Sequence, residues 1–145
     1  MSEFLKKKQI LVTNKGYERI LKKEKGVKEK MEDCVFCKLI KGDIPSKKVY
    51  EDEDILAFKD IHPAAPIHIL VIPKKHIATL MQVTQEDSNL MDKILEVIQK
   101  VAKQLEIEEK GFRLIANCGP DSGQEVMHIH FHLLAGRKMG PKIIS

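Results

Sequence analysis

Alternating and helical hydrophobic patterns divide the chain into short strands and one long helix. Runs of β-branched and aromatic residues predict strands at residues 48–50, 55–59, 67–72 and 112–116. Before the last of these, apolar residues recur at helical spacing, which predicts a helix that begins near Thr84 and continues to Leu105. Its apolar stripe comprises Leu90, Met91, Ile94, Ile98, Val101, Ala102 and Leu105. Gly111 is expected to end this element. This order of elements indicates an α+β domain built on a largely antiparallel sheet.

Residues 127–136, "MHIHFHLLAG", place three histidines at alternate positions, His128, His130 and His132. In an extended strand these side chains share one face, and the apolar residues between them share the other. Same-face neighbours lie about 6.6 Å apart, which is too far for all three to bind one metal ion easily but close enough to surround a small anion. A purely structural histidine strand is the alternative.

The composition describes a globular protein of one domain. The chain has 145 residues, of which 43% are hydrophobic and 32% charged. No stretch approaches the roughly 20 apolar residues of a membrane helix, and no signal peptide is recognisable. Three cysteines do not suggest a secreted disulfide framework, so a cytoplasmic location is expected.

The net charge of +4 is unevenly distributed. Residues 1–31 contain ten Lys/Arg and four Asp/Glu, whereas residues 32–145 contain fifteen and seventeen. A basic segment of this kind can bind nucleic acid or a membrane surface. A solvated lysine-rich tail is the simpler interpretation, so neither a nucleic acid nor a membrane is expected as a partner. Met31 could also be an alternative start.

A phosphate group suits the histidine face chemically. A neutral imidazole can attack phosphorus and form a covalent intermediate, and a second, protonated imidazole can bind phosphate oxygens or protonate the leaving group. The loop before the histidines supplies Asn117, Gly123 and Gln124 as donors for an anion. The chain has no Gly-x-x-x-x-Gly-Lys-Ser/Thr sequence, so a nucleotide would not be bound as in a P-loop protein.

These segments carry a resemblance to a known family. His-Ile-His-Phe-His-Leu-Leu, at residues 128–134, resembles the His-x-His-x-His-x-x signature of the histidine triad (HIT) superfamily, in which x is hydrophobic. "CVFCKLIKGDIPSKKVYEDEDILAFKDIHPAAPIHILVIPKKH" and "GQEVMHIHFHLLAGRKMG" are similar to its Hint branch, the purine nucleoside phosphoramidases and nucleotide hydrolases. The resemblance implies a HIT domain at residues 32–145, with a short N-terminal helix beside the long one, after a basic extension at residues 1–31.

The resemblance also implies roles for individual residues. His130 would be the nucleophile, His132 would contact the phosphate and His68 would complete the catalytic set. Asn117, Gly123 and Gln124 would form the phosphate loop, and Asp60 would bind the ribose hydroxyls. The implied nucleoside pocket consists of Phe36, Leu39, Ile44, Phe58 and Ile61. Ordinary core packing is the alternative for each of these apolar residues.

A Cys-x-x-Cys pair, Cys34 and Cys37, suggests a second site. Such a pair binds metal strongly when two histidines converge on it. Some bacterial members of the family hold a structural zinc in this way, and the resemblance implies that Cys34, Cys37, His76 and His128 do so here, with no metal needed for catalysis. A redox pair and two ordinary buried cysteines are the alternatives. Cys118 is expected to be structural.

Two departures from the family pattern concern substrate preference. Glu125 follows the glycine–glutamine pair, where several Hint proteins have a serine. The chain has no tryptophan, and "GPKIIS" at its C-terminus offers no aromatic group to a neighbouring subunit. The sequence therefore does not identify the leaving group of the substrate.

The resulting prediction is a hydrolase that acts on the α-phosphate of purine nucleoside phosphoramidates or related nucleotide conjugates through a nucleotidyl–His130 intermediate. A nucleotide-binding regulatory module with little catalysis and a dinucleoside polyphosphate hydrolase are the alternatives. The resemblance also implies a homodimer that pairs through the helix at residues 84–105 and the strand after it.

Overall fold

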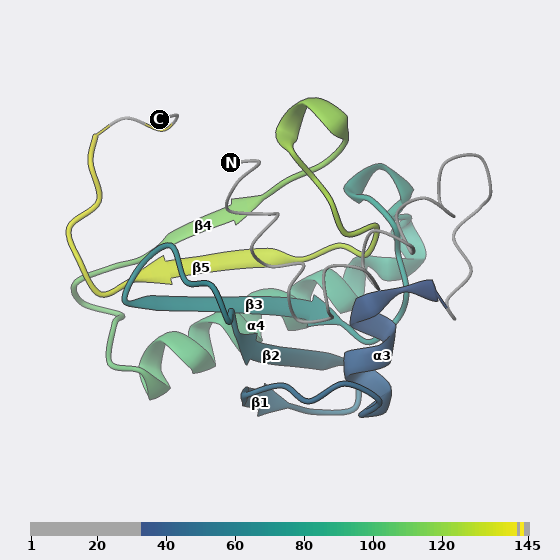
Figure 1. The fold of residues 1–145 in the computed structure, drawn as a ribbon, viewed down its shortest axis with the longest axis horizontal. Helices are drawn as coiled ribbons and strands as arrows, with labels where there is room; N and C mark the ends of the chain where they lie inside the picture. Colours follow the sequence, from purple (N-terminus) through teal and green to yellow (C-terminus); the bar gives the residue numbers. More distant parts are fainter. Residues whose placement is uncertain (1–32, 142, 144–145) are drawn as a thin grey trace.

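The computed structural model describes residues 33–141 and 143, which form one antiparallel sheet between two unequal helices (Figure 1). The predicted extension at residues 1–31 lies outside this described part. The sheet order is β1-β2-β3-β5-β4, and every neighbouring pair is antiparallel. The strands are β1 (Lys48–Glu51), β2 (Ile55–Lys59), β3 (Ile67–Pro73), β4 (Arg113–Ala116) and β5 (Phe131–Ala135), and the helices are α3 (Val35–Lys41) and α4 (Ser88–Gln104). The predicted α+β fold is confirmed.

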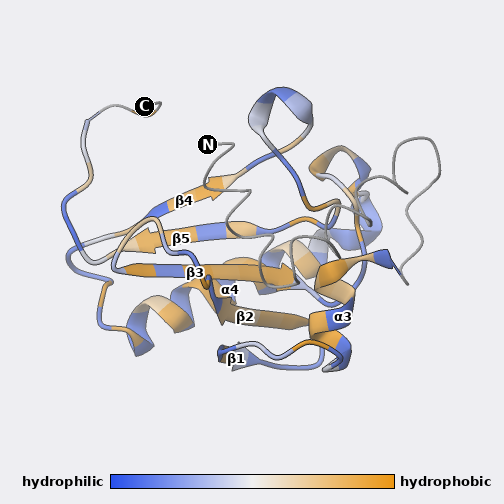
Figure 2. Cartoon of the chain, viewed as in Figure 1, coloured by the Kyte–Doolittle hydropathy of each residue, from blue (hydrophilic) through white to orange (hydrophobic). Residues whose placement is uncertain are grey.

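The sheet separates two apolar cores. Side chains alternate along β2 and β3, so Ala57 and Val71 face α4 while Phe58 and Leu70 face α3. Both central strands are apolar on both faces, as their largely orange colour in Figure 2 shows. The sequence of a strand that is buried on both sides is a continuous hydrophobic run, because neither face is exposed to water.

Helix α4 lies within the predicted helix at residues 84–105, after an initial 3-10 turn, and does not continue to Gly111. Thr84 and Asp87 form a capping box around a single 3-10 turn, Gln85–Asp87, and α4 follows at Ser88. The helix ends at Gln104 rather than near Gly111, because Glu106 adopts a positive φ of 58° and Ile107 N–H returns to the carbonyl of Ala102. This is a Schellman-type ending, and the burial of Ile107 stabilises it.

Helix α3 covers the other face at one end of the sheet. Its N-cap is Cys34, whose sulfur accepts the N–H of Cys37 at 3.4 Å. Gly42 ends the helix at a φ of 83°, a conformation that favours glycine. None of the helices in the described part of the chain has the length and apolarity needed to cross a membrane.

Candidate functional site

The three histidines do not form one continuous strand face. Strand β5 begins at Phe131, so His128 and His130 precede it and only His132 lies in the ladder. The ring of His128 turns towards the N-terminus of α3, where it lies against His76 and Phe36. The prediction of three histidines in register on one strand is therefore wrong, because the first leaves the sheet to join the cysteines.

His128 completes a group of four candidate metal ligands with Cys34, Cys37 and His76, of which only His76 is half-buried and the others are buried. The sulfurs and Nδ1 atoms of this group all lie within 4.8 Å of one another. His76 Nδ1 is 3.2 Å from His128 Nδ1, and His128 Nδ1 is 3.4 Å from Cys34 Sγ and 3.6 Å from Cys37 Sγ. A tetrahedral zinc ion with ordinary bond lengths needs its ligand atoms roughly 3.3–3.8 Å apart. The separations of 3.2–3.6 Å from His128 Nδ1 are close to those of a tetrahedral zinc site.

The protonation of these ligands also suits a cation. His128 Nε2–H donates to the carbonyl oxygen of Pro73 at 2.7 Å, which leaves the lone pair of the neutral ring on Nδ1, facing the cysteines. The pKa of the Cys37 thiol is lowered to about 3, mainly by its hydrogen bond to Cys34 and, against the opposing effect of burial, by those to His128 and His76. Cys37 is then a thiolate at neutral pH, the form that binds metal.

His130 is held by the main chain of His128, one of the candidate metal ligands. A carbonyl oxygen only accepts, so the 2.8 Å contact between His130 Nδ1 and His128 O requires the proton on Nδ1. The basic lone pair of the neutral ring is then on Nε2. The edge-on ring of Phe36, with its centroid 5.1 Å away, packs against the imidazole and restricts its rotation. His130 is therefore oriented as a nucleophile would be.

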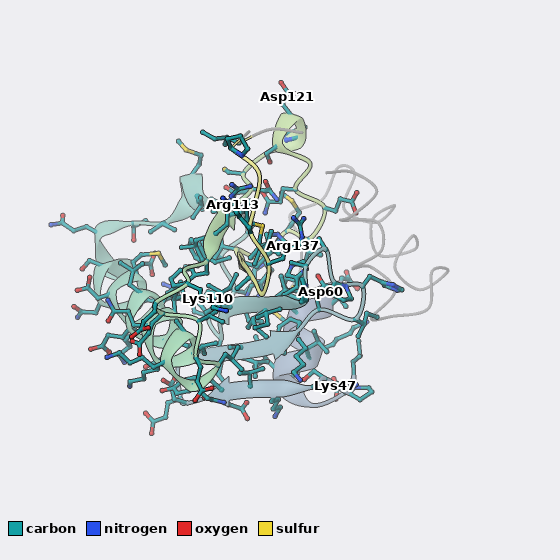
Figure 3. All side chains as sticks on the ribbon, turned by 90° about the vertical axis from the view of Figure 1, so that its left-hand side faces the viewer. Lys47, Asp60, Lys110, Arg113, Asp121 and Arg137 are labelled. Carbon is teal, nitrogen blue, oxygen red and sulfur yellow. The ribbon has the colours of Figure 1, made fainter. Side chains whose placement is uncertain are left out.

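A second pair of histidines lies beside it. His68, on β3, and His132, on β5, approach with Nε2 and Nδ1 3.1 Å apart, and the rings of His130 and His132 are 5.0 Å apart. Asp60 follows β2 directly, and its Oδ2 is 3.5 Å from His68 Nε2. Figure 3 shows Asp60 well separated from Arg113 on β4, as the strand order requires. The structure thus brings together His68, His130, His132 and Asp60, all buried.

The three residues predicted to form a phosphate loop differ in what they can offer an anion. Gln124 uses its side chain inside the protein: its Oε1 accepts Gly119 N–H, and its Nε2 donates to the carbonyls of Ala78 and Val126. Gly123 N–H donates to Pro120 O at a φ of 80°. Both residues therefore shape the loop rather than present side-chain donors.

Asn117 differs from those two residues. It follows β4 directly opposite His130 in the β4–β5 register, since Ala116 pairs with Phe131. Its Nδ2 is screened from solvent and has no hydrogen-bond partner among the described residues. A buried donor without a partner is costly and indicates a ligand contact.

The apolar residues predicted to form a nucleoside pocket are mostly core. Phe36, Leu39 and Phe58 are at most 1% exposed and pack together under α3. Ile44 is half-buried against the same cluster, whereas Ile61 is 42% exposed. Of these five residues only Ile44 and Ile61 have accessible surface, and Ile61 directly follows Asp60 in the sequence, whereas the other three are buried in the core.

Sequence reasoning missed several groups that complete the site. Ala64 N–H donates to His68 Nδ1, and the carbonyls of Pro73 and Ala78 accept from His128 and Gln124. These are backbone groups, so residue type carries no signal for them. His62 was also missed: its N–H donates to Asp60 Oδ1, and its Nε2 is screened from solvent and lacks a hydrogen-bond partner in the described chain.

Comparison with known proteins defines the family. The HIT domain family model matches residues 41–139. The chain is 46% identical to the purine nucleoside phosphoramidase of Escherichia coli over 112 aligned residues. The alignment covers 77% of this chain and 94% of the Escherichia coli protein. The chain belongs to the HIT domain family, as its sequence resemblance predicted.

Solved structures agree with this assignment. A HIT family hydrolase from Clostridium thermocellum is 51% identical to this chain and superimposes with a TM-score of 0.77. The match covers 79% of this chain and 100% of the hydrolase chain. A histidine triad protein from Clostridium difficile is 50% identical, covers 79% of this chain and 99% of that chain, and has a TM-score of 0.75. The fold is HIT-like, and the chain is a hydrolase of this family.

Proposed function

We propose that the protein hydrolyses purine nucleoside phosphoramidates, or related nucleotide conjugates, at the α-phosphate through a nucleotidyl–His130 intermediate. The observation that carries the proposal is the 2.8 Å bond from His130 Nδ1–H to the carbonyl of His128, which directs the Nε2 lone pair to the reaction. The name of the Escherichia coli relative supports this substrate class.

In the proposed reaction, His130 Nε2 attacks phosphorus and the P–N bond of the substrate breaks. The nitrogen leaves with the bonding electron pair and takes up one proton from solvent, so that it departs as an amine. Water then attacks phosphorus and gives one proton back to solvent, and the P–Nε2 bond breaks with its electron pair returning to Nε2, which releases the nucleotide and restores His130. Asn117 and His132 contribute hydrogen bonds to the phosphoryl oxygens, where charge develops.

The nucleoside side of the proposed site is formed around Asp60. Its carboxylate accepts the ribose hydroxyls, and the accessible surfaces of Ile44 and Ile61 contact the base. His68 orients His132 through the 3.1 Å contact between their rings. Gly123 and Gln124 act by holding the loop that surrounds the phosphate.

A matched pair of variants tests the nucleophile. His130→Ala removes the imidazole, whereas His130→Asn retains an N–H group able to bond the His128 carbonyl but lacks the attacking nitrogen. Both are expected to lose turnover of adenosine 5′-phosphoramidate by at least about 10³-fold, because the covalent route is closed. Wild-type rates in His130→Asn would contradict the proposal.

The alternative function is a nucleotide-binding module with little catalysis. Glu125 favours it, since a carboxylate near the leaving group repels an anionic substrate. Tight AMP binding with turnover no better than that of His130→Ala would support this alternative. A panel of phosphoramidates, dinucleoside polyphosphates and aminoacyl adenylates separates the substrate classes.

We also propose that Cys34, Cys37, His76 and His128 hold a structural zinc ion. Four protein ligands leave no open position, so the ion would stabilise the fold without taking part in the reaction. It would join the N-terminus of α3 to the segment that leads into His130. A reducing compartment such as the cytoplasm suits this site, since a disulfide between the cysteines would remove both thiolate ligands.

A homodimer is proposed from the exposed side of β4. This strand is an edge of the described sheet, and Phe112 and Leu114 beside it are 39% and 38% exposed. Leu114 pairs with Leu133, which belongs to the core under α4, so the apolar face continues past the helix into solvent. Leu95 on α4 is 55% exposed. A second copy of the chain would pair with the edge and cover these side chains.

A further inference from the structure

A line of buried side chains connects the proposed sugar site to the proposed phosphate site. Asp60 lies beside β2, His68 on β3 and His132 on β5, and these strands are adjacent. His68 is the middle member, because its Nε2 is 3.5 Å from Asp60 Oδ2 and 3.1 Å from His132 Nδ1. The side chains of Asp60 and His68 have no exposed surface in this structure, so their interaction is little screened, and the carboxylate has to be uncovered before a sugar hydroxyl can reach it.

The tautomer of His68 is fixed by the main chain. Ala64 N–H can only donate, so His68 Nδ1 accepts its hydrogen bond at 3.2 Å and carries the lone pair. The proton of the neutral ring is then on Nε2, where both Asp60 Oδ2 and His132 Nδ1 lie. One N–H group therefore faces two acceptors.

The two acceptors compete unequally for this proton. His132 Nδ1 is closer, whereas the carboxylate of Asp60 is charged, and a charged acceptor forms the stronger hydrogen bond at equal distance. The other carboxylate oxygen of Asp60 accepts His62 N–H at 2.9 Å, so the carboxylate is held in place. When a hydroxyl group donates to the Asp60 carboxylate, the carboxylate becomes a weaker acceptor for His68 Nε2–H. The His68 N–H group then donates to His132 Nδ1.

We propose that Asp60 is a positioning residue that acts through His68 on His132, so that the sugar hydroxyls of the substrate set the rate of the phosphoryl step and not only affinity. When the hydroxyls occupy Asp60, His68 Nε2–H bonds to His132 Nδ1. The neutral His132 ring then carries its proton on Nε2 and donates it to the phosphate. This inference rests on the proposed function, which assigns the ribose to Asp60 and the phosphate to His132.

Single-turnover kinetics at saturating substrate test the coupling. Adenosine 5′-phosphoramidate and its 2′,3′-dideoxy analogue are compared in the wild type, in Asp60→Asn and in His68→Gln. The wild type is expected to react about tenfold more slowly with the analogue even when saturated. In Asp60→Asn the charged acceptor that competes with His132 for the His68 proton is gone. In His68→Gln the side-chain amide has two N–H groups, so Asp60 and His132 no longer share one. In both variants the ratio of the rates with the ribose and dideoxy substrates is therefore expected to fall towards one.

A merely structural or binding role gives a different result. It would change KM for the analogue, or lower the rates of both substrates together, and the ratio of saturated rates would stay the same in all three proteins. That outcome overturns the inference. Melting temperature and zinc content of each variant identify any loss of rate that comes from misfolding.

Imidazole ¹⁵N chemical shifts provide a readout that does not depend on turnover. With AMP bound, His132 is expected to carry its proton on Nε2 in the wild type. With 2′,3′-dideoxy-AMP the two tautomers of His132 are expected to mix. Identical His132 shifts in the two complexes overturn the inference even if the enzyme hydrolyses phosphoramidates. If the wild type neither turns over the ribose substrate nor binds AMP, the proposed function itself fails, and the inference with it.

Discussion

The Nδ1–H group of His130 donates to the main-chain oxygen of His128, 2.8 Å away, while the ring of His128 belongs to the cysteine–histidine group. One residue therefore joins the candidate nucleophile to the candidate metal site. The next N–H group, that of Ile129, donates to Ile77 O at 2.8 Å and fixes the same peptide segment. Any change that moves His128 is expected to move the carbonyl that orients His130.

Cys34→Ser is expected to lose zinc and to destabilise the protein. A preformed metal site is absent from the unfolded chain, so the free energy of zinc binding adds to folding stability. Losing even ~3 kcal/mol would lower the melting temperature by roughly 10 °C in a domain of this size. Turnover should fall mainly through kcat, since a displacement of about 1 Å at His130 can cost about 100-fold.

Metal analysis of protein purified without chelators checks this prediction. Cys118→Ser is the control, because Cys118 is half-buried and outside the four-residue group. Near-stoichiometric zinc in wild type and Cys118→Ser, and its loss in Cys34→Ser, is expected. Full zinc retention in Cys34→Ser would show that the assignment is wrong.

Leu114→Glu is expected to convert a dimer into a monomer. The substitution places a charge on the exposed apolar edge, where a second copy would otherwise cover it. Sedimentation at micromolar concentration should show twice the 16.6 kDa mass for the wild type and 16.6 kDa for the variant. Lys41→Glu, on α3 at the opposite face, is the control and should remain dimeric. A monomeric wild type would contradict the proposed dimer.

Asp87→Asn is expected to remove stability that depends on pH. The Lys75 ammonium lowers the pKa of the Asp87 carboxyl, and the N–H of Thr84 in the capping box adds to this effect. A carboxyl group with a lowered pKa stabilises the fold above its unfolded pKa of about 3.9, and this contribution is lost as pH falls through the folded value.

Urea unfolding of both proteins at a series of pH values measures this contribution. The wild type should be more stable than Asp87→Asn at pH 7, and the difference should shrink below about pH 4. A difference that stays constant down to pH 2 would mean that the charge of Asp87 does not contribute.

Gly136→Ala is expected to destabilise the end of β5. Gly136 has a φ of 94°, and a Cβ atom there would lie 2.8 Å from Pro66 Cβ and 3.3 Å from Ile67 N. Strain at a positive φ costs about 1–3 kcal/mol, and the steric overlap adds to it. Thermal unfolding checks the effect, with Gly140→Ala as control, since nothing lies within 4 Å of its added Cβ. Equal melting temperatures for the two variants would contradict the prediction.

The sequence alone determined most of the strands, the start of the long helix and much of the chemistry. The strands at β2 and β3 and the capping box of α4 follow from hydrophobic period and local hydrogen bonding, which act over a few residues. The family followed from the spacing of His128, His130 and His132, and the candidate metal ligands followed from the Cys-x-x-Cys pair combined with that resemblance.

The tertiary structure decided which of these residues meet and what each one does there. His128 left the histidine face because two cysteines 94 and 91 positions away lie beside it, which no local pattern records. Phe36, Leu39 and Phe58 are buried in the core because α3 packs on the sheet. The side chain of Gln124 stabilises its loop because its Nε2 donates to the carbonyls of Ala78 and Val126. Asp60, His68 and His132 face one another only because β2, β3 and β5 are neighbours, and strand order is set by packing of the whole sheet.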